Sequence, residues 1–430
     1  MSIDRPPIAT VRVDISQEIG VPTRRASGIL YGLSEDGASP PDSFLTGMGF
    51  RFERAGGAQL DSPGGWVAGN YERRWASTLA QYRRTVALGG TFIMLVHDLY
   101  GADGTAIDRW PGDDGDFSDF DRFLDRLIDD VDAAGMNPQW DLWNEPDLDL
   151  FWARSAEQFR LAWRLAYEKV RARLPEATIV GPSTAGEPSE NDEWWNAYLD
   201  FVAASDTVPD IVSWHEIGGR AHGQDPVASR SAVEEMLARR GLRVRGLQVN
   251  EYAEASQQNP GQSAWFIARL ERARLDGLRA NWGMGPALHD NLASLLTRTR
   301  DGYAPLGDWY TYHSYAGQRG VVVASEPDAA LDVFATRLIN NSRQARLLLG
   351  NHGGVTGPVA VGVTGLQAAG LQDPRVLVER IPYDDGRPIT GPVVVRGPLV
   401  DRNDPTRVTI MLDYADARDA FAIALDSGKP

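Results

Sequence analysis

The chain has 430 residues, 43% of them hydrophobic, which is enough for a barrel-sized domain with its own core and a smaller module. Its net charge of −16 argues against nucleic acid or an anionic membrane as a partner. There is no cysteine, so a disulfide framework and thiol chemistry are excluded.

No run of about 18 apolar residues occurs, so we expect no transmembrane segment. The first residues, from Met1 to Pro7, lack the basic and apolar regions of a signal peptide. Two locations are compatible with this start: the protein is cytoplasmic, or it is secreted and its leader is absent from this chain. The oligomeric state cannot be read from the sequence.

Short apolar runs alternate with segments of helical period from about residue 28 to residue 300. One helical face is formed by Phe120, Phe123, Leu124, Leu127 and Val131, and a similar face runs from residue 159 to residue 170. Serines open both segments, Ser118 with Asp121 and Ser155 with Gln158, in the pattern of an N-terminal cap. The predicted strands are 29–33, 50–54, 92–97, 139–144, 178–181, 211–215, 247–250 and 278–282.

Eight strand–helix units over roughly 270 residues predict an α/β fold, the (β/α)8 TIM barrel. A doubly wound sheet is the alternative, but no Gly-rich phosphate loop follows the first strand. After about residue 310 the chain becomes β-rich, which predicts an accessory antiparallel β-sandwich. The alternating run 9–15 is expected to join that sheet, with an independent arm as the alternative. We therefore expect a barrel of residues 28–310 and an accessory domain of residues 1–27 plus 311–430.

The segment from Trp140 to Pro146 is the most informative motif of the chain. It predicts a strand that ends in Asn144 and Glu145, because Pro146 cannot continue a ladder and favours extended geometry at the residue before it. An amide can hold a hydroxyl while the adjacent acid exchanges a proton with a neighbouring oxygen. Glycosidic bond cleavage needs this pair, provided that a second carboxylate lies nearby.

Catalytic groups of such barrels gather at the carboxyl ends of the strands. Glu145 ends the fourth predicted strand and Glu251 the seventh, so we expect them to face each other across the barrel mouth and to act as the catalytic pair. Glu216, which ends the sixth strand, competes with Glu251. Further candidates for substrate binding end other strands: Arg54, His97, Asp98, Asn144, His215, Glu216 and Trp282. Arg54 is expected to keep the nucleophile ionised and oriented.

Structural roles remain open for several of these residues. For each histidine the alternative is a satisfied core residue, and for Trp282 it is a core tryptophan instead of a platform for a sugar ring. The acidic stretch 103–119 lacks the order of a calcium-binding EF-hand, so we predict a long active-site loop there and no metal or cofactor. Six aromatic residues are further candidates for the cleft, although several must belong to the core: Tyr71, Trp75, Trp110, Trp152, Trp194 and Trp195.

The motif Trp143-Asn144-Glu145-Pro146, with a second strand-end glutamate about a hundred residues later, resembles the clan A retaining glycoside hydrolases. Within that clan the chain is most similar to glycoside hydrolase family 39, through Tyr31-Gly32-Leu33, Arg54 and Ser213-Trp214-His215. The resemblance implies that Glu145 is the acid/base, that Glu251 is the nucleophile and that Asn144 holds the 2-hydroxyl.

Two departures from the family pattern leave the substrate open. Asn250 and Tyr252 flank Glu251 where Thr or Ser and then Trp are more usual, and Glu216 follows His215 where Tyr or a small residue is commoner. We expect a retaining O-glycoside hydrolase acting on plant or microbial glycans or glycosides. The long loop at about 100–117 favours exo action, β-xylosidase-like or α-L-arabinofuranosidase-like. The alternatives are a transglycosylase, or a catalytically silent barrel that binds carbohydrate.

Overall fold

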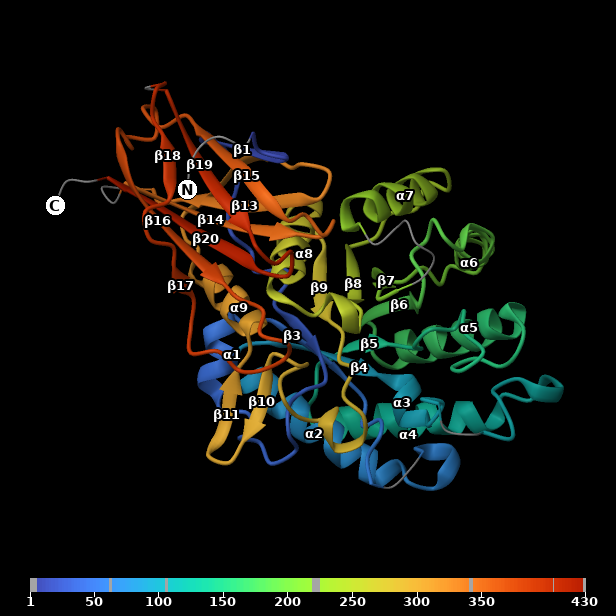
Figure 1. The fold of residues 1–430 in the computed structure, drawn as a ribbon. Coiled ribbons are helices and arrows are strands. Elements are labelled where there is room, and N and C mark those ends of the chain that lie inside the picture. The colour runs from blue at the N-terminus through green and yellow to red at the C-terminus, as the bar shows by residue number, and fades with distance from the viewer. Residues whose placement is uncertain are drawn as a thin grey trace.

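The computed structural model describes residues 6–61, 64–104, 107–218, 225–339, 343–404 and 406–427. Its centre is a closed barrel of eight parallel strands with helices on the outside (Figure 1). The TIM barrel predicted from the sequence is therefore confirmed. The barrel strands follow chain order: β2 (Gly28–Leu30), β3 (Phe52–Ala55), β4 (Thr91–Leu95), β5 (Gln139–Asp141), β6 (Thr178–Thr184), β7 (Ile211–Glu216), β8 (Gly246–Tyr252) and β9 (Asp276–Arg279).

Helices connect successive barrel strands and cover the outside of the barrel. Short 3-10 turns interrupt several connections: η1 (Trp66–Ala68), η2 (Asp113–Gly115), η3 (Ala255–Gln257) and η4 (Gly285–Ala287). A hairpin of β10 (Leu296–Thr299) and β11 (Gly302–Pro305) follows the last barrel strand. The helices are α1 (Asp42–Met48), α2 (Tyr71–Ala87), α3 (Val96–Tyr100), α4 (Ser118–Ala133), α5 (Ala156–Arg173), α6 (Asp192–Ala204), α7 (Pro226–Ala238), α8 (Pro260–Ala273) and α9 (Gly307–Gly317).

The predicted apolar faces of α4 and α5 are buried against the barrel, as their period requires. The caps differ in detail from the prediction. Ser155 accepts a hydrogen bond from the Gln158 amide, but the Gln158 side chain donates to Pro111 and Asp113, so the reciprocal half of the capping box is not formed. Ser118 is the first residue of α4 and does not cap it with its side chain.

Four strands end earlier than predicted. The first stops at Leu30 instead of residue 33. The third stops at Leu95 because α3 begins at Val96, and the eighth stops at Arg279, before Trp282. The fourth stops at Asp141, and Glu145 has φ 48°, in the left-handed region. The expectation of extended geometry at Glu145 is therefore wrong: a turn, and not the end of a straight strand, presents this side chain.

A ten-stranded sheet lies beside the barrel. Its order is β17-β16-β20-β14-β13-β12-β1-β15-β19-β18, and its pairs are antiparallel except for β1 with β15. The strands are β1 (Ala9–Gly20), β12 (Val321–Glu326), β13 (Leu331–Arg337), β14 (Gln344–Asn351), β15 (Gly357–Thr364), β16 (Pro374–Ile381), β17 (Val393–Val394), β18 (Leu399–Asp401), β19 (Arg407–Tyr414) and β20 (Ala420–Ser427).

The sheet folds over a core of its own, in agreement with the predicted sandwich. Val378 of β16 and Ile410 of β19 come from opposite ends of the strand order, yet both belong to one buried apolar cluster. Val11 and Val13 of β1 lie in the same cluster, because alternate residues of a strand point to the same face. The prediction that the N-terminal run joins the C-terminal sheet is confirmed.

The barrel and the sheet pack together through α8. Trp265 stacks on His352 with ring centroids 4.1 Å apart, and Arg272 is paired at 2.6 Å with Asp332 of β13. A Cβ atom at Gly350 would collide with the backbone of Trp265, so only glycine permits this close approach. Helix α9 packs against α1 and α8, and we propose that the barrel domain extends to the end of α9, beyond the boundary expected at residue 310. Among the described residues, no helix has the length and apolar character needed to cross a membrane.

Candidate active site

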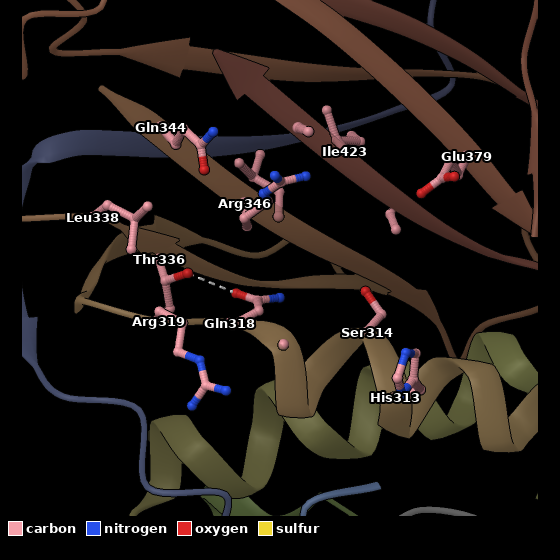
Figure 2. A pocket seen from close by; sticks show the side chains of 14 residues that line it. His313, Ser314, Gln318, Arg319, Thr336, Leu338, Gln344, Arg346, Glu379 and Ile423 are labelled. Atoms are coloured by element: carbon pink, nitrogen blue, oxygen red, sulfur yellow. Dashed lines mark hydrogen bonds between the residues drawn. The ribbon is translucent and has the colours of Figure 1, made fainter. Parts of the chain in front are cut away.

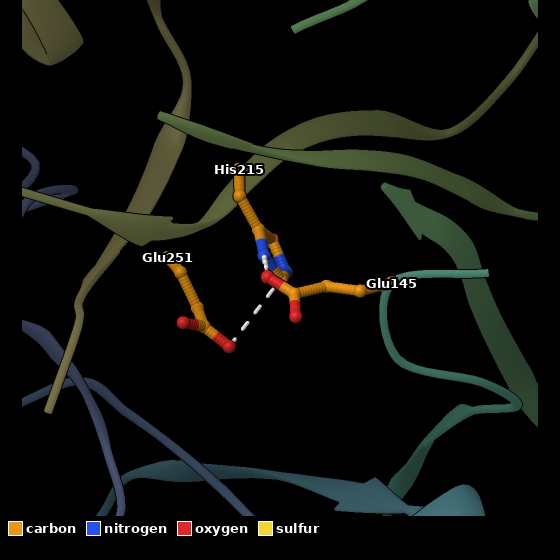
Figure 3. Close-up of side chains that lie close together, drawn as sticks. All are labelled: Glu145, His215 and Glu251. Carbon is orange, nitrogen blue, oxygen red and sulfur yellow. Dashed lines mark hydrogen bonds and ion pairs between the residues drawn. The ribbon is translucent and has the colours of Figure 1, made fainter. Parts of the chain in front are cut away.

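Glu145 and Glu251 meet at the carboxyl ends of the barrel strands, with His215 between them (Figure 3). His215 Nδ1 is hydrogen-bonded to Glu145 Oε1 at 2.9 Å, and its Nε2 lies 3.7 Å from Glu251 Oε1. An oxygen of each carboxylate and a ring nitrogen lie within 4.8 Å of one another. The two carboxyl groups are therefore closer to the spacing of retaining glycosidases, about 5–5.5 Å, than to the roughly 6.5–9.5 Å of inverting ones.

An irregularity in β8 helps to orient Glu251. Trp214 of β7 is opposite Val249 of β8, but the next residue, His215, is opposite Glu251. Asn250 is thus an extra residue in the ladder, as in a β-bulge, which re-aims the side chains that follow it. The side chains of Asn250 and Glu251 consequently both reach polar groups at the end of the barrel.

Arg54 connects the two halves of the site, as a rigid guanidinium fork can. Its three nitrogens donate to Asp141 at 2.8 Å, to Glu251 at 2.7 Å and to Asn144 at 2.8 Å. The arginine is fully buried, so these contacts fix its position. Asp141 also accepts hydrogen bonds from Asn250 and from Ser183, each at 2.9 Å, which anchors the network behind the carboxylates.

The environment of the site shifts the pKa values of three of its titratable groups, Glu145, His215 and Glu251, from their ordinary values. Burial, and then the nearby charge of Asp147, raise the pKa of Glu145 to about 7. Burial lowers the pKa of His215 to about 4, so the imidazole is neutral near pH 7. Burial also raises the pKa of Glu251, while His215 and Arg54 act in the opposite direction.

A cavity of about 770 Å³ opens above these groups, within the usual range of ligand sites, about 300–1,000 Å³. Six of the residues predicted for the site line it: Arg54, Asp98, Asn144, Glu145, Glu251 and Trp282. Trp282 is 42% exposed, so the core alternative is excluded for it. Asp98 accepts a 2.5 Å hydrogen bond from Tyr31.

The structure does not bring His97 or Glu216 to this cavity. The chain turns into α3 before His97, whose ring nitrogens are bonded to Asp98 and to the backbone oxygen of Ala102. Glu216 follows His215 on β7, and adjacent residues of a strand point to opposite faces. Its carboxylate accepts from Trp214, and burial raises its pKa to about 8. We therefore propose neither residue as a substrate contact, and His215 acts from behind the carboxylates.

The other aromatic candidates are structural. Tyr71, Trp110, Trp152 and Trp195 belong to the barrel core, and Trp75 and Trp194 pack against it. None of these six described residues lines the cavity. Trp143 and Trp152 pack edge to face with centroids 5.1 Å apart, directly behind the Asn144-Glu145 turn. Their rings support the turn and leave its polar side chains free to face the cavity.

Sequence reasoning missed four polar residues that line the cavity: Tyr31, Gln59, Arg74 and Asn281. Gln59 lies in the loop after β3 and accepts a hydrogen bond from the Gly285 amide at 2.8 Å. Tyr31 and Asn281 closely follow the first and eighth barrel strands, so a stricter reading of strand ends would have found them. Arg74 lies on α2 and carries no such signal; it donates to Asp103 at 2.9 Å.

The acidic stretch 103–119 is held by protein contacts where it is described. Asp113 accepts from Arg154 and Gln158, and Asp116 accepts from the backbone of Ser118. Asp103 and Gly104 are its contribution to the cavity, and residues 105–106 lie outside the described part. Among the described residues, Glu145, His215 and Glu251 are the group close enough together to share a metal ion, and they are the site already described.

A separate hollow of about 320 Å³ lies between α9 and the sheet (Figure 2). Gln318, at the end of α9, accepts a hydrogen bond from Thr336 of β13 at 3.0 Å. Glu379 is the one carboxylate among the described residues that line this hollow. It therefore lacks the pair of carboxyl groups that glycosidic cleavage requires, and we do not assign it to the active site.

No protein-family model matches the chain. Two curated proteins from bifidobacteria match it in sequence. The 3-O-alpha-D-galactosyl-alpha-L-arabinofuranosidase of Bifidobacterium longum subsp. longum is 24% identical over 428 residues, which cover 84% of this chain and 35% of the relative. The 3-O-beta-L-arabinopyranosyl-alpha-L-arabinofuranosidase of Bifidobacterium pseudocatenulatum is 25% identical, with 72% and 35% covered. The chain thus spans about a third of the length of these relatives.

Solved structures share the whole fold. The protein N2152 of Neocallimastix frontalis superposes with a TM-score of 0.77 at 21% identity, covering 98% of this chain and 100% of that one. A family 39 β-xylosidase from Caulobacter crescentus gives a TM-score of 0.61 at 16% identity, covering 97% and 99%. The resemblance to clan A glycoside hydrolases, family 39 among them, is therefore confirmed at the level of the fold.

Proposed function

We propose that the chain is a retaining glycoside hydrolase in which Glu145 is the acid/base and Glu251 the nucleophile. The observation that carries the proposal is the pair of buried carboxylates, one from the β5 end and one from β8, within 4.8 Å of each other at the floor of a cavity. The names of the curated relatives, both arabinofuranosidases, support the same chemistry.

In the first step, a carboxylate oxygen of Glu251 attacks the anomeric carbon while Glu145 gives its proton to the glycosidic oxygen. The bond between that carbon and oxygen breaks, the leaving group departs as an alcohol, and the sugar is bound as an ester of Glu251. In the second step, Glu145 takes a proton from water, and the water oxygen attacks the same carbon. The ester bond to Glu251 breaks, and Glu251 leaves as a carboxylate. Two inversions restore the original anomer.

The imidazole of His215 supports this division of roles. A neutral imidazole carries one N–H, so one ring nitrogen donates and the other accepts. A protonated Glu145 donates to Nδ1, which leaves the N–H on Nε2, and this nitrogen lies 3.7 Å from Glu251. This arrangement places a hydrogen-bond donor on the side of Glu251, which favours the ionised form of that carboxylate.

Arg54 and Asn144 prepare the two reactive groups. The guanidinium charge, 2.7 Å from Glu251, favours the ionised carboxylate that attack requires. Because Asn144 Oδ1 already accepts from Arg54, its NH2 group is the part of the side chain suited to a sugar hydroxyl. By the family pattern, we propose that this hydroxyl is the 2-hydroxyl of the sugar.

We propose an α-L-arabinofuranosyl unit as the sugar that is released, in an exo mode. Both curated relatives carry this sugar in their names, each with a further sugar on its 3-oxygen. A cavity of about 770 Å³ lies towards the upper end of the usual range of ligand sites, which suits a substituted sugar end.

The proposal is tested with nitrophenyl glycosides, including α-L-arabinofuranosides with and without a 3-O-glycosyl group and β-D-xylosides. Proton NMR then identifies the anomer that forms first. We expect cleavage of an α-L-arabinofuranoside with the α-anomer as the first product. A β-anomer as first product would contradict the retaining mechanism, and a preference for xylosides would contradict the sugar.

Two further measurements separate hydrolysis from the alternatives. Product analysis with an added acceptor sugar reports transglycosylation, which uses the same two carboxylates. Glycan binding by isothermal titration without any turnover would identify a silent binding protein, and this outcome would refute the enzymatic proposal.

A further inference from the structure

The mouth of the active-site cavity is apolar, although its floor is charged. Twelve large hydrophobic side chains are exposed on the described part of the protein, and four of them line this one cavity: Leu148, Leu150, Trp282 and Met284. Leu150 is 62% and Met284 75% exposed. Single exposed apolar residues need no explanation, but a group of them at the rim of a ligand site marks a binding surface.

Two of these residues belong to the loop that carries the proposed acid. Leu148 and Leu150 lie three and five residues after Glu145, and we call them the leucine wall. The loop is held in place by its own hydrogen bonds: the Leu148 amide donates to Glu145 at 3.1 Å, and the Trp152 amide donates to Leu148 at 2.8 Å. Asp147 also accepts from the Ala185 amide at 2.8 Å. The leucine wall is therefore an ordered surface that is formed before substrate binds.

The position of the acid decides which part of the substrate meets this wall. Glu145 must lie within hydrogen-bond reach of the glycosidic oxygen in order to protonate it. The leaving group is bonded to that same oxygen, so it begins beside Glu145 and extends toward the mouth along the loop that follows. Across the barrel, the loop after β9 contributes Met284 to the opposite rim.

We propose that the leaving group of the natural substrate is apolar, so that the enzyme cleaves the glycoside of a hydrophobic alcohol or phenol. This inference rests on the proposed function and adds the class of aglycone to it. A sugar leaving group would bring hydroxyls against methyl groups, and polar groups that lose water without gaining a partner weaken binding. An alkyl or aryl group gains from covering the leucine wall.

The test is a series of alkyl glycosides that share the sugar found in the nitrophenyl screen and carry methyl, butyl, hexyl or octyl leaving groups. Chain length changes the apolar area along this series but hardly changes the chemistry of the departing alcohol. We expect kcat/KM to rise with chain length, by up to about fourfold for each methylene that covers the wall. A disaccharide with a sugar leaving group should be cleaved less efficiently than the octyl glycoside.

Variants assign the effect to the wall. Leu148→Asn combined with Leu150→Asn should reduce the gain in kcat/KM from the methyl to the octyl glycoside by about tenfold or more. Leu161→Asn is the matched control, because Leu161 is an exposed leucine on α5 outside the cavity. It should leave the rise unchanged.

The outcomes distinguish this inference from the proposed function. If nitrophenyl glycosides are cleaved but the wild-type enzyme shows no dependence on chain length, or prefers the sugar leaving group, the apolar aglycone is refuted and the hydrolase stands. An unchanged rise in the double variant refutes the role of the leucine wall. If no glycoside is cleaved by the folded protein, the proposed function fails and this inference fails with it.

Discussion

Arg54 donates a hydrogen bond of 2.7 Å to the carboxylate of Glu251, and both side chains are buried. The same guanidinium reaches Asp141 and Asn144, so it sets the position and charge of the proposed nucleophile together. An ammonium group in its place would keep the charge but could not reproduce the three-way fork.

Arg54→Lys should therefore lower kcat by about a hundredfold or more while the protein remains folded. The measurement is steady-state kinetics on the best glycoside, together with circular dichroism to confirm the fold. A lysine variant with near wild-type kcat would show that the fork is dispensable.

Glu251→Ala should be almost inactive, because no covalent intermediate can form. Added azide should restore turnover of an activated aryl glycoside and yield a glycosyl azide of inverted configuration, since a single displacement replaces two. NMR of the azide product provides the check. Glu145→Ala is the contrasting variant: if Glu145 is the acid/base, azide there should yield a product of retained configuration.

On the alkaline side of the pH profile, kcat/KM should decline as Glu145 loses its proton. Burial and Asp147 raise the pKa of Glu145 to about 7, so kcat/KM should fall about tenfold per pH unit above that value. Asp147→Asn removes the nearby negative charge and keeps an amide oxygen for the Ala185 contact. The alkaline limb should then move to lower pH, and an upward shift would contradict the electrostatic role of Asp147.

Replacing Glu145 by glutamine should stabilise the protein at alkaline pH. The pKa of Glu145 is raised from 4.5 to about 7 on folding, so the folded state binds more protons than the unfolded state between these values. The contribution of Glu145 to stability is fully present below about pH 4.5 and is lost as pH rises through about 7. At pH 8 the free energy of unfolding of Glu145→Gln should exceed that of the wild type by up to about 3 kcal/mol, and the two should converge near pH 4.5. Thermal unfolding of both proteins at both pH values provides the measurement. Equal Tm values for the wild type and Glu145→Gln at pH 8 would show that the buried, ionised Glu145 does not destabilise the folded protein.

Glu216→Gln should retain kcat/KM within about threefold of the wild type, a small change on the scale of catalytic losses. Its carboxylate points away from the cavity, and burial raises its pKa to about 8, so it is largely neutral at pH 7 and glutamine is a close substitute. Steady-state kinetics on the best glycoside provides the comparison. A loss of several orders of magnitude would transfer the role of nucleophile from Glu251 to Glu216.

The periodicity of the chain is sufficient to predict the barrel and the sandwich. It also predicts that the N-terminal strand belongs to the C-terminal sheet. The same residues that define one face of α5 in sequence are the residues buried in the fold, because burial of an apolar face is the main force that places a helix. The strand count also leads to Glu145 and Glu251, which the structure brings together.

The details that sequence reasoning misses depend on backbone geometry that is not encoded locally. The apolar run before His97 predicts a strand end there, but α3 begins one residue earlier and turns this histidine into the core. Pro146 predicts an extended Glu145, yet the left-handed φ of Glu145 and the extra residue Asn250 in β8 are what aim the two carboxylates. Such turns and bulges are set by tertiary packing. The packing of α2 against the barrel likewise brings Arg74 to the cavity, although no local pattern marks this residue.

The place of β1 in the sheet has a consequence for biosynthesis. Arg12 of β1 is paired with Glu326 of β12, 314 residues further along the chain. At about 5–20 residues per second, a ribosome needs roughly 15–60 s to make the intervening segment. Throughout that time the valines of β1 have no partner, and an unpaired strand with apolar residues invites association with other chains. The yield of folded protein should thus depend on how well the emerging segment is shielded until translation reaches the last quarter of the chain.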